Sequence, residues 1–236
     1  MKAVFKRECA GFFHTGLGFL FLFIFAVLSG AIFYLNNLLP RSSDMSGFFA
    51  LVSYLWMLLS PILVMRLLPS DIKNSTQPLL MTSPASVAAI VSAKYLAAFV
   101  MLTVSLLASL VFPLVIALFG RAYLPEICVG FIGLLLYGAA YLAFDMLASV
   151  FARNAASAFA LALGANLLLR LSGVIASAVK LRLLPAVLSF FDLEKRYLPF
   201  INGQLSFASI IYYVLMTAAC LICTIQAMNI RRWSHA

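Results

Sequence analysis

The chain has 236 residues, of which 65% are hydrophobic and 10% charged, and its mean hydropathy is +1.10. Soluble domains carry about 45–50% apolar and about 25% charged residues, so this composition excludes an ordinary soluble domain. The net charge of +9 comes from basic residues at the ends of apolar segments, which indicates membrane topology and anionic headgroups rather than a nucleic-acid partner.

The length allows about six membrane helices with short connections, because one span needs about 20 apolar residues. Residues 1–15 interleave basic with apolar side chains and predict an interfacial elbow helix at the inner headgroups. The apolar run 16–35 resembles a signal peptide but lacks an A-x-A-like cleavage site, so it predicts the first membrane helix. The second membrane helix is expected over 47–65.

Residues 66–86 form a polar segment rich in turn-forming residues, and they are the main candidate for a cytoplasmic docking element between helices 2 and 3. The third membrane helix is expected over 87–119, with an interfacial lead-in to about Lys94 and a kink at Pro113. The fourth covers 127–150 and the fifth 155–171, and only a short turn separates them.

Residues 172–206 mix charged with apolar side chains, which favours short re-entrant or interfacial helices outside the cytoplasm over a seventh span. The sixth membrane helix is expected over 209–228. The whole chain, 1–236, is therefore predicted to be one all-α membrane domain with six transmembrane helices.

The distribution of basic residues favours a topology with both termini in the cytoplasm. In that arrangement the inner side holds nine of the sixteen basic residues: Lys2, Lys6, Arg7, Arg66, Lys73, Lys94, Arg153, Arg231 and Arg232.

No catalytic, cofactor or metal site is expected, so the chain is predicted not to be an enzyme. The sequence contains no phosphate-binding loop, no H-E-x-x-H motif and no Cys/His cluster. Cys220 and Cys223 form a C-x-x-C pair inside an apolar run, without the further ligands that a metal site needs.

Asp145 is an acidic residue deep in an apolar helix, and such a residue is by default a functional hypothesis. Tyr137, Tyr141, Asp145 and Ser149 recur every four residues and form one intramembrane polar stripe. The stripe contacts a proton, an ion or a substrate, or it holds a structural carboxyl group satisfied by Tyr141 and neighbouring helices. Arg170 is expected to reach the outer interface rather than Asp145.

Ala156, Ala160 and Gly164 follow a small-x-x-x-small pattern, which lets another helix approach closely. The partner helix belongs to the same subunit or to a second copy.

Three stretches carry a family resemblance. In residues 66–84, Arg66, Asp71, Thr76, Leu79, Leu80, Thr82 and Pro84 stand at or near the positions of R-x-x-x-x-E-[RK]-x-x-G-T-x-E-x-L-L-x-[ST]-x-P, with Ser75 in place of the glycine and Pro78 in place of the second acid. Residues 149–154 resemble S-x-[FL]-x-x-N, and Tyr197, Phe200, Gly203, Tyr212 and Tyr213 resemble F-x-x-F-x-x-G…YY. Together they are similar to ABC-2 type transporter permeases of the gliding-motility-type branch.

The resemblance implies the permease subunit of an exporter in the cell membrane of a prokaryote. The chain itself would bind no cofactor, because a separate ABC ATPase would hold ATP and magnesium. The residues implied in ATPase docking are Arg66, Asp71, Lys73, Thr76, Leu79, Leu80, Thr82, Arg153 and Asn154.

The resemblance also implies further partners. A second permease copy or a paralogue would complete a homodimer or heterodimer, with the transport path between helices 2 and 5 of the two halves. A subunit with a large extracytoplasmic domain would contact residues 172–206, and membrane lipids would surround the spans.

Two other functions stay open. A proton- or ion-coupled secondary transporter would use Asp145. A non-transporting membrane assembly subunit would need no transport path.

Overall fold

The computed structural model describes residues 2–14, 16–65, 67, 86–120, 123–178 and 190–234, and every regular element within these ranges is a helix. In chain order the elements are α1 (Lys2–His14), α2 (Gly16–Phe33), the π-helix η1 (Tyr34–Leu38), α3 (Ser46–Val64), α6 (Val87–Ser109), α7 (Val111–Phe119), α8 (Leu124–Val150), α9 (Ala155–Ala178), α11 (Leu193–Ile201) and α12 (Phe207–Ser234).

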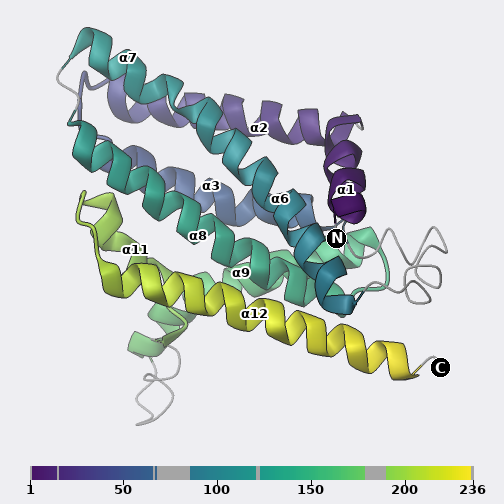
Figure 1. Cartoon of the computed structure of the whole chain (residues 1–236). Coiled ribbons are helices and arrows are strands. Elements are labelled where there is room, and N and C mark those ends of the chain that lie inside the picture. Colours follow the sequence, from purple (N-terminus) through teal and green to yellow (C-terminus); the bar gives the residue numbers. More distant parts are fainter. Residues whose placement is uncertain are drawn as a thin grey trace.

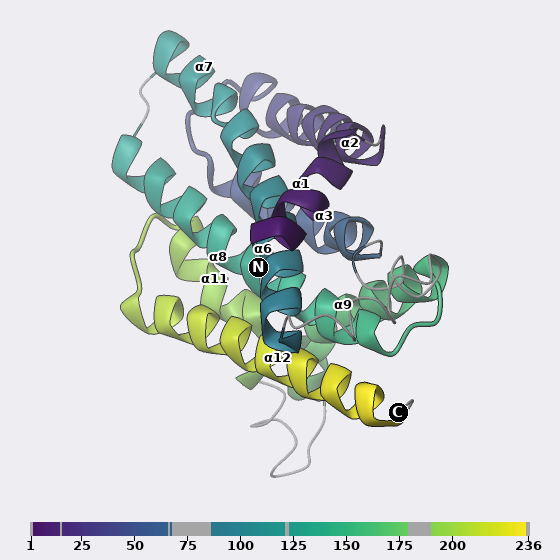
Figure 2. The ribbon, with the colours of Figure 1, turned by 45° about the vertical axis from the view of Figure 1, so that its right-hand side comes forward.

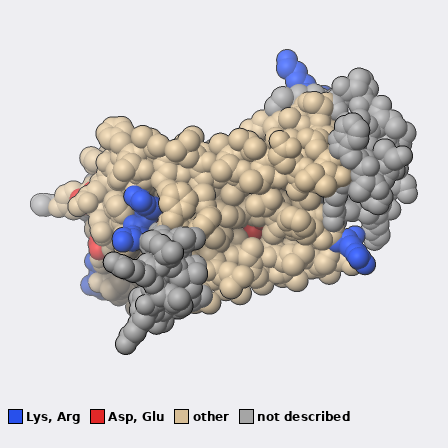
Figure 3. Space-filling model, turned by 90° about the horizontal axis from the view of Figure 1, so that it is seen from below, with Lys and Arg blue, Asp and Glu red and all other residues tan. Residues whose placement is uncertain are grey.

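Six helical stretches are long and apolar enough to span a membrane: α2 with η1, α3, α6 with α7, α8, most of α9, and most of α12. This result confirms the prediction of a multi-pass helical membrane protein. Figure 3 shows the matching charge distribution, with Lys and Arg gathered near the two ends of the molecule and a broad band between them that is nearly free of charge.

The six spans run lengthwise, whereas α1 lies across one end of the bundle (Figure 1). The C-terminal end of α12, the start of α6 and the α8–α9 turn lie at this same end, which we call the α1 end. The α2–α3 and α7–α8 connections lie at the opposite end, the far end. Figure 2 shows α1 crossing α6 and α2, the two helices on which it packs.

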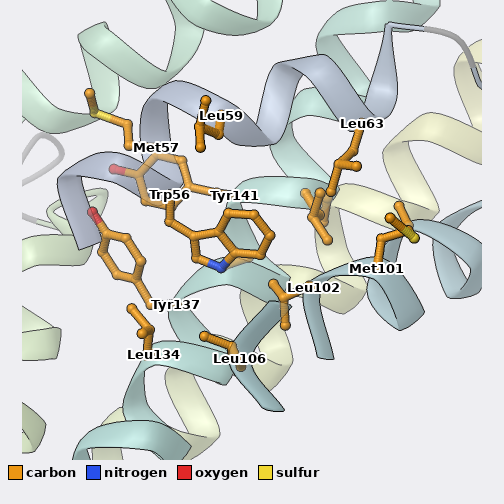
Figure 4. Packing of buried hydrophobic residues seen from close by; sticks show 14 of the residues in the cluster. Trp56, Met57, Leu59, Leu63, Met101, Leu102, Leu106, Leu134, Tyr137 and Tyr141 are labelled. Carbon is orange, nitrogen blue, oxygen red and sulfur yellow. The ribbon is translucent and has the colours of Figure 1, made fainter. Parts of the chain in front are cut away.

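The helices α3 and α8 form the centre of the bundle. In their spans 61–67% of the residues are buried, against 22–39% in the other four. The helix α8 contacts α3, α6, α9, α11 and α12. Trp56 of α3 packs between the two central helices and α2, with its ring 5.6 Å from those of Phe21 and Phe25. Figure 4 shows Trp56 in the middle of this packing, beside Tyr137, Tyr141 and Leu102.

The close packing of Trp56 on α8 depends on Gly138. A Cβ atom at this position would collide with the indole of Trp56 and with Leu102. Small residues at helix contacts are what membrane bundles need, because packing replaces the hydrophobic effect as the source of association.

The third span breaks between α6 and α7, at Leu110. Pro113 explains the break, because proline lacks an N–H group and its ring collides with the carbonyl group four residues earlier, here that of Ser109. The helix α6 continues through Lys94 without interruption, and the side chain of this residue is fully buried. That the residues before Lys94 lie at the membrane interface stays a prediction.

The observed helices extend past several predicted boundaries. The first span continues through η1 to Leu38, α8 begins at Leu124, α9 continues to Ala178, and α12 runs over Phe207–Ser234. Hydropathy finds the part of a helix inside the hydrocarbon, and a helix does not end where that part ends.

The described part of the region 172–206 contains the end of α9 and the short helix α11. One face of α11 packs into the bundle, burying Leu193, Tyr197 and Phe200. Of the predicted docking element 66–86, only Leu67 and Ser86 are described, and Ser86 caps α6 by accepting a hydrogen bond from the backbone N–H of Ala89 at 3.2 Å.

Candidate functional site

The polar stripe of α8 lies inside the bundle. Tyr137, Tyr141, Asp145 and Ser149 are all buried, each with no more than 2% of its surface exposed. The spacing of four residues keeps them on one side of α8. The four side chains therefore lie inside the bundle, where their neighbours come from other helices, and their placement within the membrane stays a prediction.

Asp145 lies beside Ser60 of α3 and Asn166 of α9, which both interact with its carboxyl group. The amide of Asn166 donates to the carbonyl of Met57 at 3.0 Å and to the hydroxyl of Ser60 at 3.3 Å. Within the described residues, neither carboxyl oxygen of Asp145 makes a hydrogen bond of ordinary geometry. This carboxyl group therefore retains binding capacity in a buried, polar niche.

Tyr141 does not satisfy Asp145, and this part of the structural interpretation is wrong. The ring of Tyr141 packs on that of Tyr137, with 4.7 Å between the centroids. Side chains on an α-helix lean toward its N-terminus, so Tyr141 leans away from a residue that follows it by one turn. Ser60 and Asn166 are polar residues within apolar spans. This feature of the sequence could have indicated them as neighbours of Asp145.

The side chain of Arg170 is largely enclosed by residues of α3, α8 and α11. That it reaches the outer interface stays a prediction. Its side chain is 10% exposed and forms an ion pair with Glu194 of α11. It donates to the hydroxyl of Tyr137 at 3.2 Å, and its guanidinium carbon lies 3.3 Å from the ring centroid of Tyr54. Burial of this cation is offset by the carboxylate and the aromatic face.

A tyrosine cluster joins the stripe to α11 and α12. The ring of Tyr137 lies 4.9 Å from that of Tyr197 and 6.4 Å from that of Tyr213. The hydroxyl of Tyr213 donates to the carbonyl of Leu193 at 2.7 Å. Two residues of the stretch that resembles F-x-x-F-x-x-G…YY therefore fasten α11 and α12 to the central helix.

Gly203 of the same stretch has a positive φ of 69° at the end of α11. A Cβ atom there would also collide with Glu126 at the start of α8. Glycine adopts this backbone region without the steric penalty of other residues, so Gly203 permits the turn between α11 and α12.

A second cluster, the Lys94 junction, lies at the α1 end and consists of Lys94, Glu8 and Leu67. The fully buried amino group of Lys94 pairs with Glu8 of α1 at 3.0 Å and donates to the backbone carbonyl of Leu67. Arg7 also pairs with Glu8, at 2.7 Å. The junction ties together α1, α6 and the chain just beyond α3.

The electrostatics of the junction act on Glu8. Burial alone would raise its pKa, but the positive charges of Lys94 and Arg7 lower it further than burial raises it, and the pKa lies below its ordinary value. Glu8 is therefore a carboxylate at neutral pH. Because Lys94 and Glu8 are distant in the sequence, neither span periodicity nor motif spacing indicates their contact.

The α8–α9 turn carries two of the predicted docking residues, Arg153 and Asn154, and both are exposed at the α1 end. Asn154 caps α9, since its side-chain oxygen accepts from the N–H of Ser157 at 2.7 Å. The hydroxyl of Ser157 in turn accepts from the N–H groups of both turn residues at 3.1 Å. The other predicted docking residues, Arg66, Asp71, Lys73, Thr76, Leu79, Leu80 and Thr82, lie outside the described residues.

The small-residue face of α9 is open. Ala156 and Ala160 are exposed, and a Cβ atom at Gly164 would have no atom within 4 Å. Within the described part of the chain, a Cβ atom at Gly164 meets no other helix, so whether the partner of this face belongs to the same subunit or to a second copy stays open.

The two C-x-x-C residues differ in burial, since Cys220 is buried and Cys223 is exposed. Among the residues that the structure describes, no group of three His, Cys, Asp or Glu side chains is placed to hold a metal ion.

Comparison with known proteins adds no relative to these observations. No protein-family model matches the chain, and no curated protein matches it either. The functional assignment therefore depends on the residues of this chain.

Proposed function

We propose that this chain is the permease subunit of an ABC-2 type exporter in the cell membrane of a prokaryote, with both termini in the cytoplasm. Energy comes from a separate ABC ATPase, and a second permease copy or a paralogue completes the transporter. The three family-like stretches and the six spans support this proposal.

The observation that carries the proposal is the position of the Lys94 junction. The element expected to contact the ATPase begins beside Leu67, whose carbonyl group is bonded to Lys94. The exposed turn with Arg153 and Asn154 lies at the same end of the bundle. A force applied at this end would act on α1 and α6 together, because the ion pair between Glu8 and Lys94 joins them.

In the proposed mechanism, ATP-driven closure of two ATPases pushes the docking elements and rocks the two permease halves between inward and outward states. An apolar groove of about 320 Å³ lies between α2, α3 and α9. Its lining includes Phe21, Leu59 and Phe159. The expected transport path lies between the second and fifth spans of the two halves, which are α3 and α9, so it would adjoin this groove. A second copy would cover the open face of α9.

Co-purification from native membranes, followed by mass spectrometry, tests the class. An ABC ATPase is expected among the companions, and its ATP hydrolysis should depend on the permease. Replacement of Arg153 by Glu should reduce the recovery of the ATPase, whereas Lys195→Glu on α11 at the far end serves as the matched control. Recovery of the intact chain without any ATPase would contradict the proposal.

A second candidate function is a proton- or ion-coupled transporter, and the observation that favours it is the buried carboxyl group of Asp145, which makes no hydrogen bond of ordinary geometry with the described residues. Vesicle transport separates the two functions. An exporter driven by ATP keeps its activity in Asp145→Asn and loses it when the partner ATPase cannot hydrolyse ATP. A coupled transporter behaves in the opposite way.

A further inference from the structure

A pocket of about 270 Å³ lies at the far end of the bundle, between the α2–α3 connection and α7. Its lining includes both apolar and polar residues. The apolar ones come from α2, η1 and α7: Phe33, Leu38, Val115, Ile116 and Phe119. The polar ones come from η1 and the connection that follows it: Asn37, Arg41, Ser42 and Ser43, and Gly120 completes the lining.

The polar part of the lining contains an available positive charge. Arg41 is exposed and makes no ion pair within the described chain. Its backbone has a positive φ of 54°, a region that non-glycine residues avoid. A cation at the boundary between apolar spans and a polar connection is placed to meet an anionic headgroup.

The polar part of the lining also contains an acceptor that lacks a donor. The amide nitrogen of Asn37 donates to the carbonyl groups of Ser42 at 3.2 Å and Asp44 at 2.8 Å. Both partners are carbonyl oxygens, so the orientation of the amide is determined. The side-chain oxygen of Asn37 is consequently left buried and without a partner among the described residues, although such groups are usually satisfied.

We propose that this pocket binds an anionic phospholipid whose headgroup carries hydroxyl groups, such as phosphatidylglycerol. The phosphate pairs with Arg41, a headgroup hydroxyl donates to the side-chain oxygen of Asn37, and an acyl chain lies along Ile116 and Phe119. The apolar and polar residues of the lining match the two parts of a lipid, and the charge of Arg41 matches the phosphate.

Native mass spectrometry of the detergent-solubilised chain tests the site. The protein is titrated with phosphatidylglycerol and, separately, with phosphatidylcholine of the same acyl chains. We expect the unmodified protein to retain phosphatidylglycerol preferentially. One headgroup contact is worth about a fivefold change in affinity near a membrane surface, so Arg41→Gln should lower phosphatidylglycerol binding by about that factor. Arg41→Lys should restore most of the preference.

Arg41→Gly separates lipid binding from folding. Glycine relieves the positive φ, so the lipid-free variant should melt at the same temperature as the unmodified protein or higher. The same variant should bind phosphatidylglycerol as weakly as Arg41→Gln. General destabilisation cannot weaken lipid binding while leaving the melting temperature unchanged or raising it.

Lys195→Gln is the matched control, because Lys195 is an exposed cation at the far end outside the pocket. It should leave the lipid preference unchanged. The proposal is overturned if Arg41→Gln binds phosphatidylglycerol like the unmodified protein, or if Lys195→Gln loses binding equally. It is also overturned if soluble glycerol phosphate stabilises the protein as well as the lipid does, because the site would then take a free phosphate.

Discussion

At the scale of single residues, buried charges decide most of what can be tested. Asp145, Lys94 and Arg170 lie in spans, yet their surroundings differ. Lys94 and Arg170 face a carboxylate, whereas Asp145 faces only a hydroxyl and an amide. Removing one partner of a buried ion pair destabilises the folded protein, because the other charge is left unpaired. A buried polar group with poor hydrogen bonds destabilises the folded protein, because its lost hydration is not replaced.

Asp145→Asn should therefore raise the stability of the folded chain by about 1–3 kcal/mol, because it replaces a poorly bonded carboxyl group by a neutral amide of the same shape. Thermal unfolding in detergent measures the change. Glu126→Gln, at an exposed position of α8, should shift stability by less than about 0.5 kcal/mol. A loss of stability in Asp145→Asn would mean that the carboxyl group has a partner in the membrane.

Lys94→Met should destabilise the protein by about 3 kcal/mol, since it leaves Glu8 and the carbonyl of Leu67 without their buried donor. The double variant Lys94→Met/Glu8→Gln should recover part of this loss. A double-mutant cycle over the four proteins measures the coupling between the two side chains. Purely additive effects would show that the ion pair contributes nothing.

The depressed pKa of Glu8 predicts how stability depends on pH. Because the unfolded chain binds this proton more readily than the folded one, the contribution of Glu8 is complete above its unfolded pKa and disappears as the pH falls through the folded pKa. Unfolding midpoints measured from pH 7 down to the acid limit should fall less steeply in Glu8→Gln than in the unmodified protein. Identical slopes would contradict the prediction.

At the scale of helices, two glycines with opposite surroundings give a matched pair. Gly138→Ala places a methyl group against Trp56 and Leu102 in the centre of the bundle, and such overpacking costs about 1–3 kcal/mol. Gly164→Ala meets open space and adds helix propensity, so its fold should be as stable as the original or more stable. Unfolding midpoints of the two variants and of the unmodified protein, measured under the same conditions, check this difference in stability.

Gly164 also reports on a second copy. If another subunit covers the open face of α9, Gly164→Ile should weaken self-association in a membrane while leaving the unfolding midpoint of the monomer unchanged. Single-molecule photobleaching in lipid nanodiscs measures the stoichiometry, with Leu215→Ile at an exposed position of α12 as the control. Equal dimer fractions in all three proteins would place the interface elsewhere.

At the scale of the whole molecule, the number of spans determines which ends share a side. With six spans, α1 and the α8–α9 turn lie on one side of the membrane and α11 on the other. In a cysteine-free background, Lys6→Cys and Arg153→Cys should react with an impermeant thiol reagent from the same side, and Lys195→Cys only from the opposite side. Labelling of all three from one side would contradict the six-span arrangement.

The sequence was sufficient for the spans, because a span depends on a local run of apolar residues. Asp145 and Tyr141 could be assigned to one face of α8 from their separation by four residues alone. Their partners could not be assigned, because a span that is apolar on all sides has no periodicity to show which face turns inward. The contacts of Lys94 with Glu8 and of Arg170 with Glu194 depend on such rotations and on the path of the connecting chain.

The break at Leu110 bears on how a displacement would pass along the third span. The helix α6 is continuous from the Lys94 junction to Ser109. Beyond Leu110 the chain lacks the hydrogen bond that Pro113 cannot donate, and we expect such a joint to bend more easily than an unbroken helix. If the α1 end is displaced, we therefore expect α6 to move more than α7, and the far-end pocket beside Ile116 and Phe119 to change less than the α1 end does.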